Sequence, residues 1–287
     1  MDDNKIFIVG ANGQLGTALR AQYPNSRFAD ITELDITDRD SVENFDWSQI
    51  EIILNAAAFT NVDAAETPEG RVAAWKVNAE AVANLTRVCL KHDMTLVHIS
   101  SDYVFDGTRE PHLETESFSP LSVYGDSKAA GDIVISLLPK HYVLRTTWVI
   151  GEGKNFVRTM LELAKKNISP TVVSDQIGRL TFTSELVRAI DHLLTTHADY
   201  GTYNVTNDGP LASWADITRQ IFTLASRDDL TVTDTTTAEY FANKPGVAPR
   251  PLGSDMSLDK LHATGFTSRN WQDDLSEYIK KETTNLR

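Results

Sequence analysis

The chain has 287 residues, 41% hydrophobic and 23% charged, a composition typical of globular proteins with room for one large domain or two small ones. The net charge of −13 argues against a nucleic-acid-binding surface, which needs a basic footprint. The sequence also argues against a membrane protein or a secreted one: no apolar run is long enough to cross a bilayer, "MDDNKIFIVG" is unlike a secretory signal, and a single cysteine, Cys89, fits the reducing cytoplasm.

Short apolar runs alternate with helical patterns through the first 150 residues. We expect strands at 5–9, 27–30, 51–57, 95–101 and 142–148. We expect helices at 13–22, from about 68 to 91, and from about 124 onward. Strands that alternate with helices predict a parallel sheet covered on both faces, here a Rossmann-like doubly wound α/β fold.

The pattern is looser in the second half of the chain. We expect helices at 155–166, 184–197 and 213–226, strands at 171–174 and 201–206, and an irregular segment rich in proline and glycine at 243–254. The sequence therefore predicts a dinucleotide-binding domain at 1–150 and a smaller, mainly substrate-binding α/β domain at 151–287. The elements at 171–206 are also compatible with a return to the first sheet.

A glycine loop follows the first expected strand and opens the first expected helix. "IVGANGQLG" contains Gly10, Gly13 and Gly16, which permit a tight turn and close approach of the backbone to a dinucleotide pyrophosphate. The helix start offers free N–H groups and a positive dipole. The G-x-x-G-x-x-G spacing is the form found in short-chain dehydrogenase/reductases. The candidate cofactor residues in this loop are Gly10, Asn12, Gly13, Gln14, Leu15 and Gly16.

Two further stretches predict the remainder of a cofactor site. Asp30 ends the second expected strand, where a carboxylate holds the adenosine ribose hydroxyls and repels a 2′-phosphate. Asp35 and Ile36, in "LDITD", are placed to flank the adenine. Small side chains at the end of the third expected strand let a cofactor pass, and they belong to Ala56, Ala57 and Ala58.

The stretch "SVYGDSKAAG" places Tyr124 and Lys128 on one helix face, one turn apart. Ser101 ends the strand "TLVHISS", at the carboxyl edge of the sheet where α/β proteins bind ligands. A free phenol, with a pKa of about 10, exchanges protons poorly at neutral pH, and a lysine ammonium nearby favours its phenolate. The three side chains therefore predict a proton-transfer site beside a nicotinamide.

With these residues the sequence resembles the extended short-chain dehydrogenase/reductases and, within them, the dTDP-4-dehydrorhamnose reductases. The matching stretches run along nearly the whole chain: "GANGQLG", "LDITD", "NAAAFTNVDAAE", "VNAE", "ISSDYVFDG", "YGDSKAAGD", "LRTTWV", "NFVRTML", "VVSDQIG", "RPLGSDMSLDKL" and "WQDDL". The resemblance implies reduction of the 4-keto group of dTDP-4-dehydro-β-L-rhamnose to dTDP-L-rhamnose by NADPH or NADH, with Tyr124 as proton donor. It places the chain in nucleotide-sugar metabolism that feeds cell-wall polysaccharides.

Residue by residue, the resemblance implies a catalytic triad of Ser101, Tyr124 and Lys128, with Tyr124 and Lys128 also contacting the cofactor. It implies further cofactor contacts from Gly10, Gln14, Leu15, Asp35, Ile36, Ala56, Ala57 and Thr60. It implies a substrate site lined by Ser101, Asp102, Tyr103, Trp148 and Arg250. A guanidinium suits the substrate diphosphate because it binds in a bidentate manner.

The chain departs from the family pattern at a few places. Ser101 stands where threonine is usual, and Leu180 where proline is usual. Some relatives dimerise through magnesium held by glutamates, but one such position is Ala18 here, so we expect no metal and either a monomer or a homodimer.

Two alternatives remain open from the sequence. The first is a 4-ketoreductase for another dTDP-6-deoxysugar. A dehydratase is disfavoured because Tyr103, not a second acid, follows Asp102. The second is a non-catalytic regulatory subunit that resembles the β-subunit of methionine adenosyltransferase, which shares a similar "SSDYVFDG".

Overall fold

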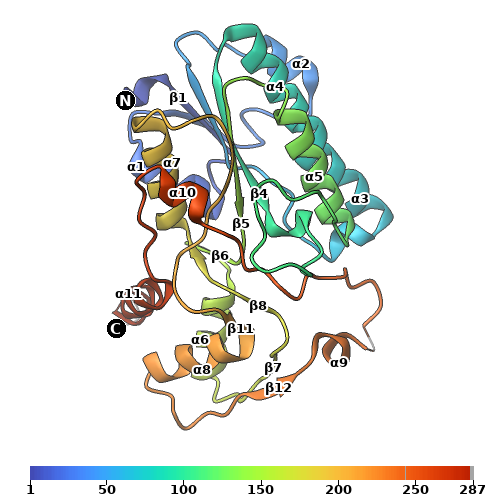
Figure 1. Ribbon diagram of the computed structural model, residues 1–287, viewed down its shortest axis with the longest axis vertical. Helices are drawn as coiled ribbons and strands as arrows, with labels where there is room; N and C mark the ends of the chain where they lie inside the picture. The colour runs from blue at the N-terminus through green and yellow to red at the C-terminus, as the bar shows by residue number, and fades with distance from the viewer. Residues whose placement is uncertain (243, 285–287) are drawn as a thin grey trace.

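A six-stranded, wholly parallel sheet with helices on both faces forms the centre of the protein, seen in a computed structural model that describes residues 1–242 and 244–284 (Figure 1). Its strand order is β10-β5-β4-β3-β1-β2. The strands span β1 (Ile6–Val9), β2 (Arg27–Ala29), β3 (Ile52–Asn55), β4 (Thr95–Ser101), β5 (His141–Thr146) and β10 (Gly201–Asn204). The predicted doubly wound parallel fold is confirmed.

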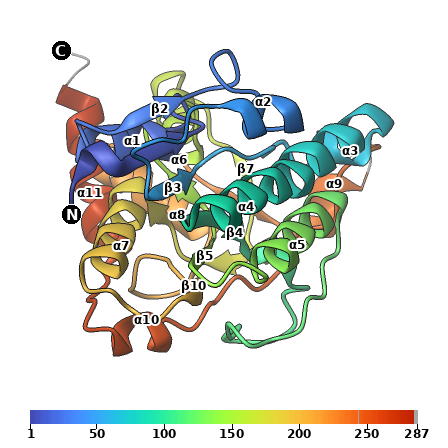
Figure 2. The ribbon, with the colours of Figure 1, turned by 90° about the horizontal axis from the view of Figure 1, so that it is seen from above.

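Strand β1 shows why the sheet is covered on both sides. Ile6 and Ile8 join one buried cluster, and Phe7 and Val9 join the other, so that alternate side chains enter opposite cores. Figure 2 shows α1 and α7 on one side of the strands and α4 and α5 on the other. The covering helices are α1 (Gln14–Gln22), α7 (Thr183–Thr195), α2 (Arg39–Asn44), α4 (Ala81–His92) and α5 (Val123–Ile135).

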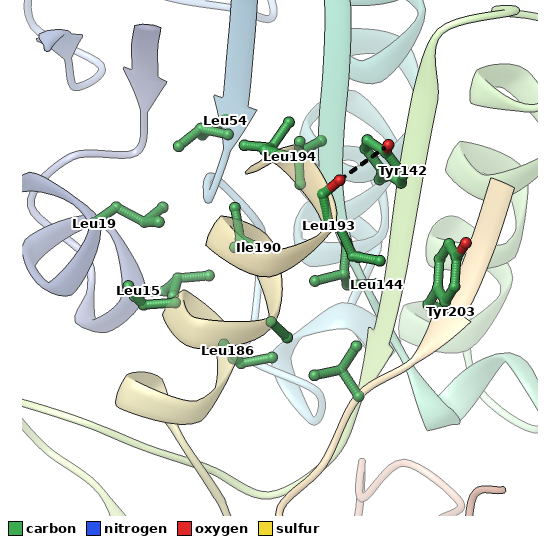
Figure 3. Packing of buried hydrophobic residues seen from close by; sticks show 14 of the residues in the cluster. Leu15, Leu19, Leu54, Tyr142, Leu144, Leu186, Ile190, Leu193, Leu194 and Tyr203 are labelled. Carbon is green, nitrogen blue, oxygen red and sulfur yellow. Dashed lines mark hydrogen bonds between the residues drawn. The ribbon is translucent and has the colours of Figure 1, made fainter. Parts of the chain in front are cut away.

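The contact between α1 and α7 fills one of these cores. Leu15 and Leu19 of α1 face Leu186 and Ile190 of α7, with Leu54 of β3 above them in the view of Figure 3. Burial of a leucine or isoleucine side chain contributes about 1.5–3 kcal/mol. This packing fixes the direction of α1, and with it the position of the glycine loop at its start.

The long helix predicted from about 68 to 91 consists of three consecutive pieces. They are α3 (Pro68–Trp75), a π-helical turn (Lys76–Glu80) and α4. The π turn places Asn78 in the interior, where its amide contacts the backbone of Phe59 and the hydroxyl of Ser127. The extra residue of the π turn lies where the helix packs against α5, and it brings Asn78 inward at that point.

A smaller group of elements follows directly from the carboxyl end of β5. Helices α6, α8 and α11 lie beyond that end of the main sheet (Figure 1) and share one buried cluster, which includes the fully buried Trp271. The helices of this group are α6 (Phe156–Lys165), α8 (Trp214–Leu224), α9 (Thr237–Phe241) and α11 (Trp271–Thr284), whereas α10 (Asp259–Ala263) packs against β10 of the main sheet.

Three two-stranded sheets complete the second half of the chain. They pair β6 (Val149–Ile150) with β9 (Thr181–Phe182), β7 (Thr171–Val173) with β12 (Thr233–Thr235), and β8 (Ile177–Gly178) with β11 (Ala212–Ser213). Within the stretch 171–206, β7, β8 and β9 therefore lie in small sheets. In contrast, β10 is a strand of the main sheet, and α7 packs against that sheet. The division into two domains near residue 150 stays a prediction.

The described part of the segment 243–254 contains no helix or multi-residue strand, while Asn243 itself lies outside the described residues. Short 3-10 turns occupy Asp3–Lys5, Ala64–Glu66 and Asp102–Val104. None of the helices that the structure describes has the length and apolar character needed to cross a membrane.

Candidate active site

The glycine loop begins at the point where the strand order reverses, between β1 and β3. Gly10 has a φ of +72°, and a Cβ there would lie 2.6 Å from the backbone nitrogen of Ala57. A Cβ on Gly16 would lie 2.1 Å from the carbonyl oxygen of Gly10. Only glycine is tolerated at either position, so the loop and α1 pack closely and leave a cradle of backbone N–H groups.

A cavity of about 450 Å³ opens beside this loop. Its lining includes nine of the predicted cofactor residues: Gly10, Asn12, Gly13, Asp30, Asp35, Ile36, Ala56, Ala57 and Ala58. The Asp30 carboxylate is fixed there because it accepts hydrogen bonds from the backbone N–H groups of Asn12 (2.9 Å) and Ile31 (2.8 Å).

A second cavity, of about 400 Å³, adjoins the first, because Gly13, Ala56 and Ala58 line both. Its lining includes the other predicted residues Gln14, Leu15, Thr60, Ser101, Asp102, Tyr103, Tyr124, Lys128 and Trp148. The described lining of the two cavities includes neither Gly16, which acts through packing, nor Arg250. Residues predicted from separate motifs therefore meet along one continuous hollow.

Tyr124 and Lys128 reach the second cavity from α5. The Ser122 hydroxyl caps this helix by accepting a hydrogen bond from the N–H of Gly125 (3.2 Å), which places Tyr124 in the first turn. The Lys128 side chain is 1% exposed, and its Nζ donates to the carbonyl of Ile99 at 2.6 Å. Burial lowers the pKa of the Lys128 amine to about 8, although the Asp132 carboxylate opposes this change.

The Tyr124 phenol is also largely buried, at 9% exposure. Burial raises its pKa to about 12, and a hydrogen bond with Ser101 partly offsets that rise. Its ring meets the Tyr103 ring edge to face, with centroids 5.3 Å apart. At neutral pH the resting site therefore holds a protonated phenol and a lysine that is mostly charged.

Asp102 gathers hydroxyl groups from three parts of the chain. Its carboxylate accepts hydrogen bonds from Ser101 (3.0 Å), Thr147 (2.9 Å) and Ser254 (2.6 Å). It is 2% exposed, and burial raises its pKa although these hydrogen bonds lower it. Asp102 thus fixes the Ser101 hydroxyl at the end of β4 and ties the segment around Ser254 to the site.

Trp148 combines a site position with a structural contact. It lines the second cavity, and its indole stacks on Trp214 with ring centroids 3.8 Å apart. Its φ of +47° is unusual for a bulky residue, and such outliers concentrate at functional sites.

Arg250 is held by an acidic residue that was not among the predicted site residues. Its Nη2 donates to both carboxylate oxygens of Asp63 (2.8 and 2.9 Å), and its Nη1 donates to the carbonyl of Ala248. The guanidinium also lies over the Phe241 ring, 4.7 Å from its centroid. The positive charge therefore has an anionic partner in the resting protein.

Several side chains of the site were not predicted from the sequence. Asp63 lies inside the quoted motif "NAAAFTNVDAAE" but nothing there signals a partner nearly two hundred residues away. Thr147 and Ser254 carry only ordinary hydroxyls, and their link to Asp102 emerges from the fold. Within residues 1–242 and 244–284, no group of three or more His, Cys, Asp or Glu side chains is arranged to hold a metal ion.

A dinucleotide cradle at the switch point of the sheet, next to a buried serine, tyrosine and lysine, defines an oxidoreductase of the extended short-chain dehydrogenase/reductase class. Residues 4–284 match the protein family described as the RmlD substrate binding domain. The dTDP-4-dehydrorhamnose reductase of Aggregatibacter actinomycetemcomitans is 38% identical over 93% of this chain and 96% of its own.

Solved structures agree with this match. A dTDP-4-dehydrorhamnose reductase from Clostridium acetobutylicum superposes with a TM-score of 0.89 at 36% identity, covering 97% of this chain and 99% of that one. The dTDP-4-dehydrorhamnose reductase from Bacillus anthracis, in complex with NADP, gives a TM-score of 0.87 at 34% identity, covering 96% and 97%. The chain belongs to the dTDP-4-dehydrorhamnose reductase family.

Proposed function

We propose that this protein reduces the 4-keto group of dTDP-4-dehydro-β-L-rhamnose to a hydroxyl, giving dTDP-L-rhamnose, with NADPH or NADH as the reductant. The observation that carries the proposal is the continuous hollow in which a glycine-lined cradle adjoins Ser101, Tyr124 and Lys128. The related reductase from Bacillus anthracis, bound to NADP, supports the choice of cofactor.

The residues present fit a dinucleotide. A Cβ on Gly10 or Gly16 would collide with neighbouring backbone, so the glycines allow the tight turn of a dinucleotide cradle, and Asp30 lies where the adenosine ribose is expected. We assign cofactor binding to the lining of the first cavity together with Gln14, Leu15, Thr60, Tyr124 and Lys128. When bound, the nicotinamide supplies the hydride that the carbonyl carbon receives.

In the proposed reaction Tyr124 gives its phenolic proton to the ketone oxygen while the C4 carbon takes the hydride. The O–H bond of Tyr124 breaks and an O–H bond forms on the sugar, so a phenolate remains. Lys128, charged below its pKa of about 8, stabilises that phenolate. The Ser101 hydroxyl, held by Asp102, contacts the phenol and orients it beside the ketone.

We assign the sugar and its nucleotide to Ser101, Asp102, Tyr103 and Trp148, with Arg250 as the contact to the diphosphate. Because Arg250 is paired with Asp63, the diphosphate has to share or replace that carboxylate. We further propose that the protein works in the cytoplasm as a monomer or homodimer and binds neither nucleic acid nor metal, in keeping with its acidic composition and its single buried cysteine.

The test is turnover with purified protein. Incubation with dTDP-4-dehydro-β-L-rhamnose and NADPH or NADH should consume the cofactor, followed by the loss of nicotinamide absorbance, and give the L-rhamno product by proton NMR. A 4-ketoreductase for another sugar would give the other C4 configuration or accept a different dTDP-4-keto-6-deoxysugar. A regulatory subunit would bind cofactor without consuming it.

A further inference from the structure

Behind the proposed proton donor, three buried polar side chains form a chain from the sheet to α5. Asn55 ends β3, His98 lies in the middle of β4, and Lys128 lies on α5. Their exposures are 1%, 0% and 1%. A buried polar group without a hydrogen-bond partner costs stability, so each donor in this chain should face an acceptor. The direction of each hydrogen bond can be derived from this requirement.

The Asn55 amide fixes the direction of the first contact. The backbone N–H of Ala57 donates to its Oδ1 at 3.1 Å, which turns its Nδ2 toward His98. That Nδ2 lies 3.1 Å from His98 Nδ1. An amide nitrogen donates and does not accept, so Nδ1 must be the acceptor, and the neutral imidazole carries its proton on Nε2.

The second contact then follows. His98 Nε2 lies 3.5 Å from Lys128 Nζ, whose other close partner is the carbonyl of Ile99. An Nε2–H group facing an ammonium places two donors against each other, whereas a neutral amine offers a lone pair to that N–H. We propose that His98, held in its Nε2–H tautomer by Asn55, is a positioning residue that stabilises the neutral amine of Lys128 by donating a hydrogen bond to it.

The other charges around Lys128 act in both directions. Asp132, on α5, is the carboxylate that acts on the Lys128 amine, while Asp102 follows β4 and Arg145 lies on β5, the two strands against which α5 packs. The Asp132 carboxylate favours the ammonium but is itself paired with Arg145 at 3.0 Å. Burial, followed by the charge of Lys128, holds the pKa of His98 well below its usual range, so His98 stays neutral.

This arrangement has a consequence for turnover, which rests on the proposed roles of Tyr124 and Lys128. After Tyr124 has given its proton to the ketone, the phenolate needs a proton for the next cycle. By stabilising the neutral amine, His98 makes the Lys128 ammonium more acidic, and a more acidic ammonium is a better source of that proton.

The tautomer can be read directly from the resting protein, without turnover. Nitrogen-15 labelling of histidine and two-bond proton–nitrogen correlation spectra should assign His98 as the neutral Nε2–H form throughout the pH range in which the fold is stable. A proton on Nδ1, or an imidazolium at neutral pH, would overturn the proposal. Failure of the proposed reduction would leave this result unaffected, so the two are distinguishable.

A double-mutant cycle tests the coupling to Lys128. In Asn55→Asp the carboxylate still accepts from Ala57 but can only accept from His98, which moves the imidazole proton to Nδ1 and leaves Nε2 as an acceptor for the ammonium. The Lys128 pKa, followed by NMR of carbon-13-labelled lysine, should rise by about one unit, roughly the effect of one hydrogen bond to a charged group.

The new charge of Asn55→Asp also raises the Lys128 pKa directly. The same substitution in a His98→Met background measures this direct electrostatic contribution alone. We expect a clearly smaller rise there, because no imidazole passes the change on. An equal rise of the Lys128 pKa in both backgrounds would show that the new charge acts only directly, and it would refute the positioning role of His98. If the His98→Met background does not fold, His98→Gln serves instead, since its amide nitrogen can still donate to Lys128 and should keep the wild-type pKa.

Discussion

Tyr124→Phe removes a single oxygen atom from the centre of the proposed site. The ring keeps its contacts, including the edge-to-face pair with Tyr103 and the packing against Ala65, Ala74 and Val123. The substitution removes the hydrogen bond to Ser101, and a hydrogen bond of that kind contributes about 0.5–1.5 kcal/mol to stability. The variant should therefore fold and bind cofactor as the wild type does.

Turnover should nevertheless fall steeply. General acid catalysis typically contributes about 10²–10⁴-fold, and a phenyl ring has no proton to give. Because the Tyr124 pKa is raised to about 12, the wild-type donor stays protonated throughout the neutral range, so the loss should be the same from mildly acidic to mildly basic pH. We expect the loss in kcat, with little change in the Kd of NADPH.

The assay combines steady-state kinetics with a fluorescence titration of NADPH. Tyr142→Phe is the matched control, since Tyr142 is also a buried tyrosine, on β5, and its hydroxyl donates to the carbonyl of Ala198, away from both cavities. It should keep the wild-type kcat. A Tyr124→Phe enzyme that turns over near the wild-type rate would refute the assignment of the proton donor.

Four further variants test the remaining assignments. Burial disfavours the Lys128 ammonium and lowers its pKa to about 8, so kcat/KM for reduction should fall as pH rises through that value. Lys128→Met should lower activity and abolish this fall at high pH. A fall that persists in the variant would have to be assigned to another group. Arg250→Ala should raise the sugar KM roughly 10- to 100-fold with cofactor affinity unchanged, as expected for the loss of hydrogen bonds to a charged group. Asp63→Ala removes the carboxylate that pairs with Arg250 and should lower that KM or leave it unaltered. Loss of NADPH binding in Arg250→Ala would show that this residue contacts the cofactor and not the sugar nucleotide. Asp30→Asn should improve NADPH relative to NADH, because the carboxylate repels a 2′-phosphate, and an unchanged ratio of kcat/KM values would show that Asp30 does not face the ribose.

Local patterns were enough to predict the main sheet and the place of the site. Apolar runs and the glycine loop predict β1 and α1, and the Tyr124–Lys128 spacing predicts the helix that carries both residues. The carboxyl ends of parallel strands share one edge, which is why motifs from β1, β3 and β4 meet at two adjoining cavities.

Contacts between distant segments could not be predicted in this way. The short strands β9 and β11 have two residues each, too few for a periodic signal, and β12 is mostly exposed and polar. The pairing of Arg250 with Asp63 and the contact of His98 with Lys128 join residues whose own neighbours in sequence give no sign of a partner. Such pairs depend on how helices and loops settle on the sheet, which a single sequence does not encode locally.

The most direct test of the account follows a labelled hydrogen atom. Purified protein is incubated with dTDP-4-dehydro-β-L-rhamnose and NADPH that carries deuterium at the transferred position, and the sugar is analysed by NMR and mass spectrometry. The account predicts one deuterium on C4 of a product with the L-rhamno configuration, and a strongly reduced yield in Tyr124→Phe. An unlabelled sugar, or a label on a C4 carbon of the opposite configuration, would contradict it.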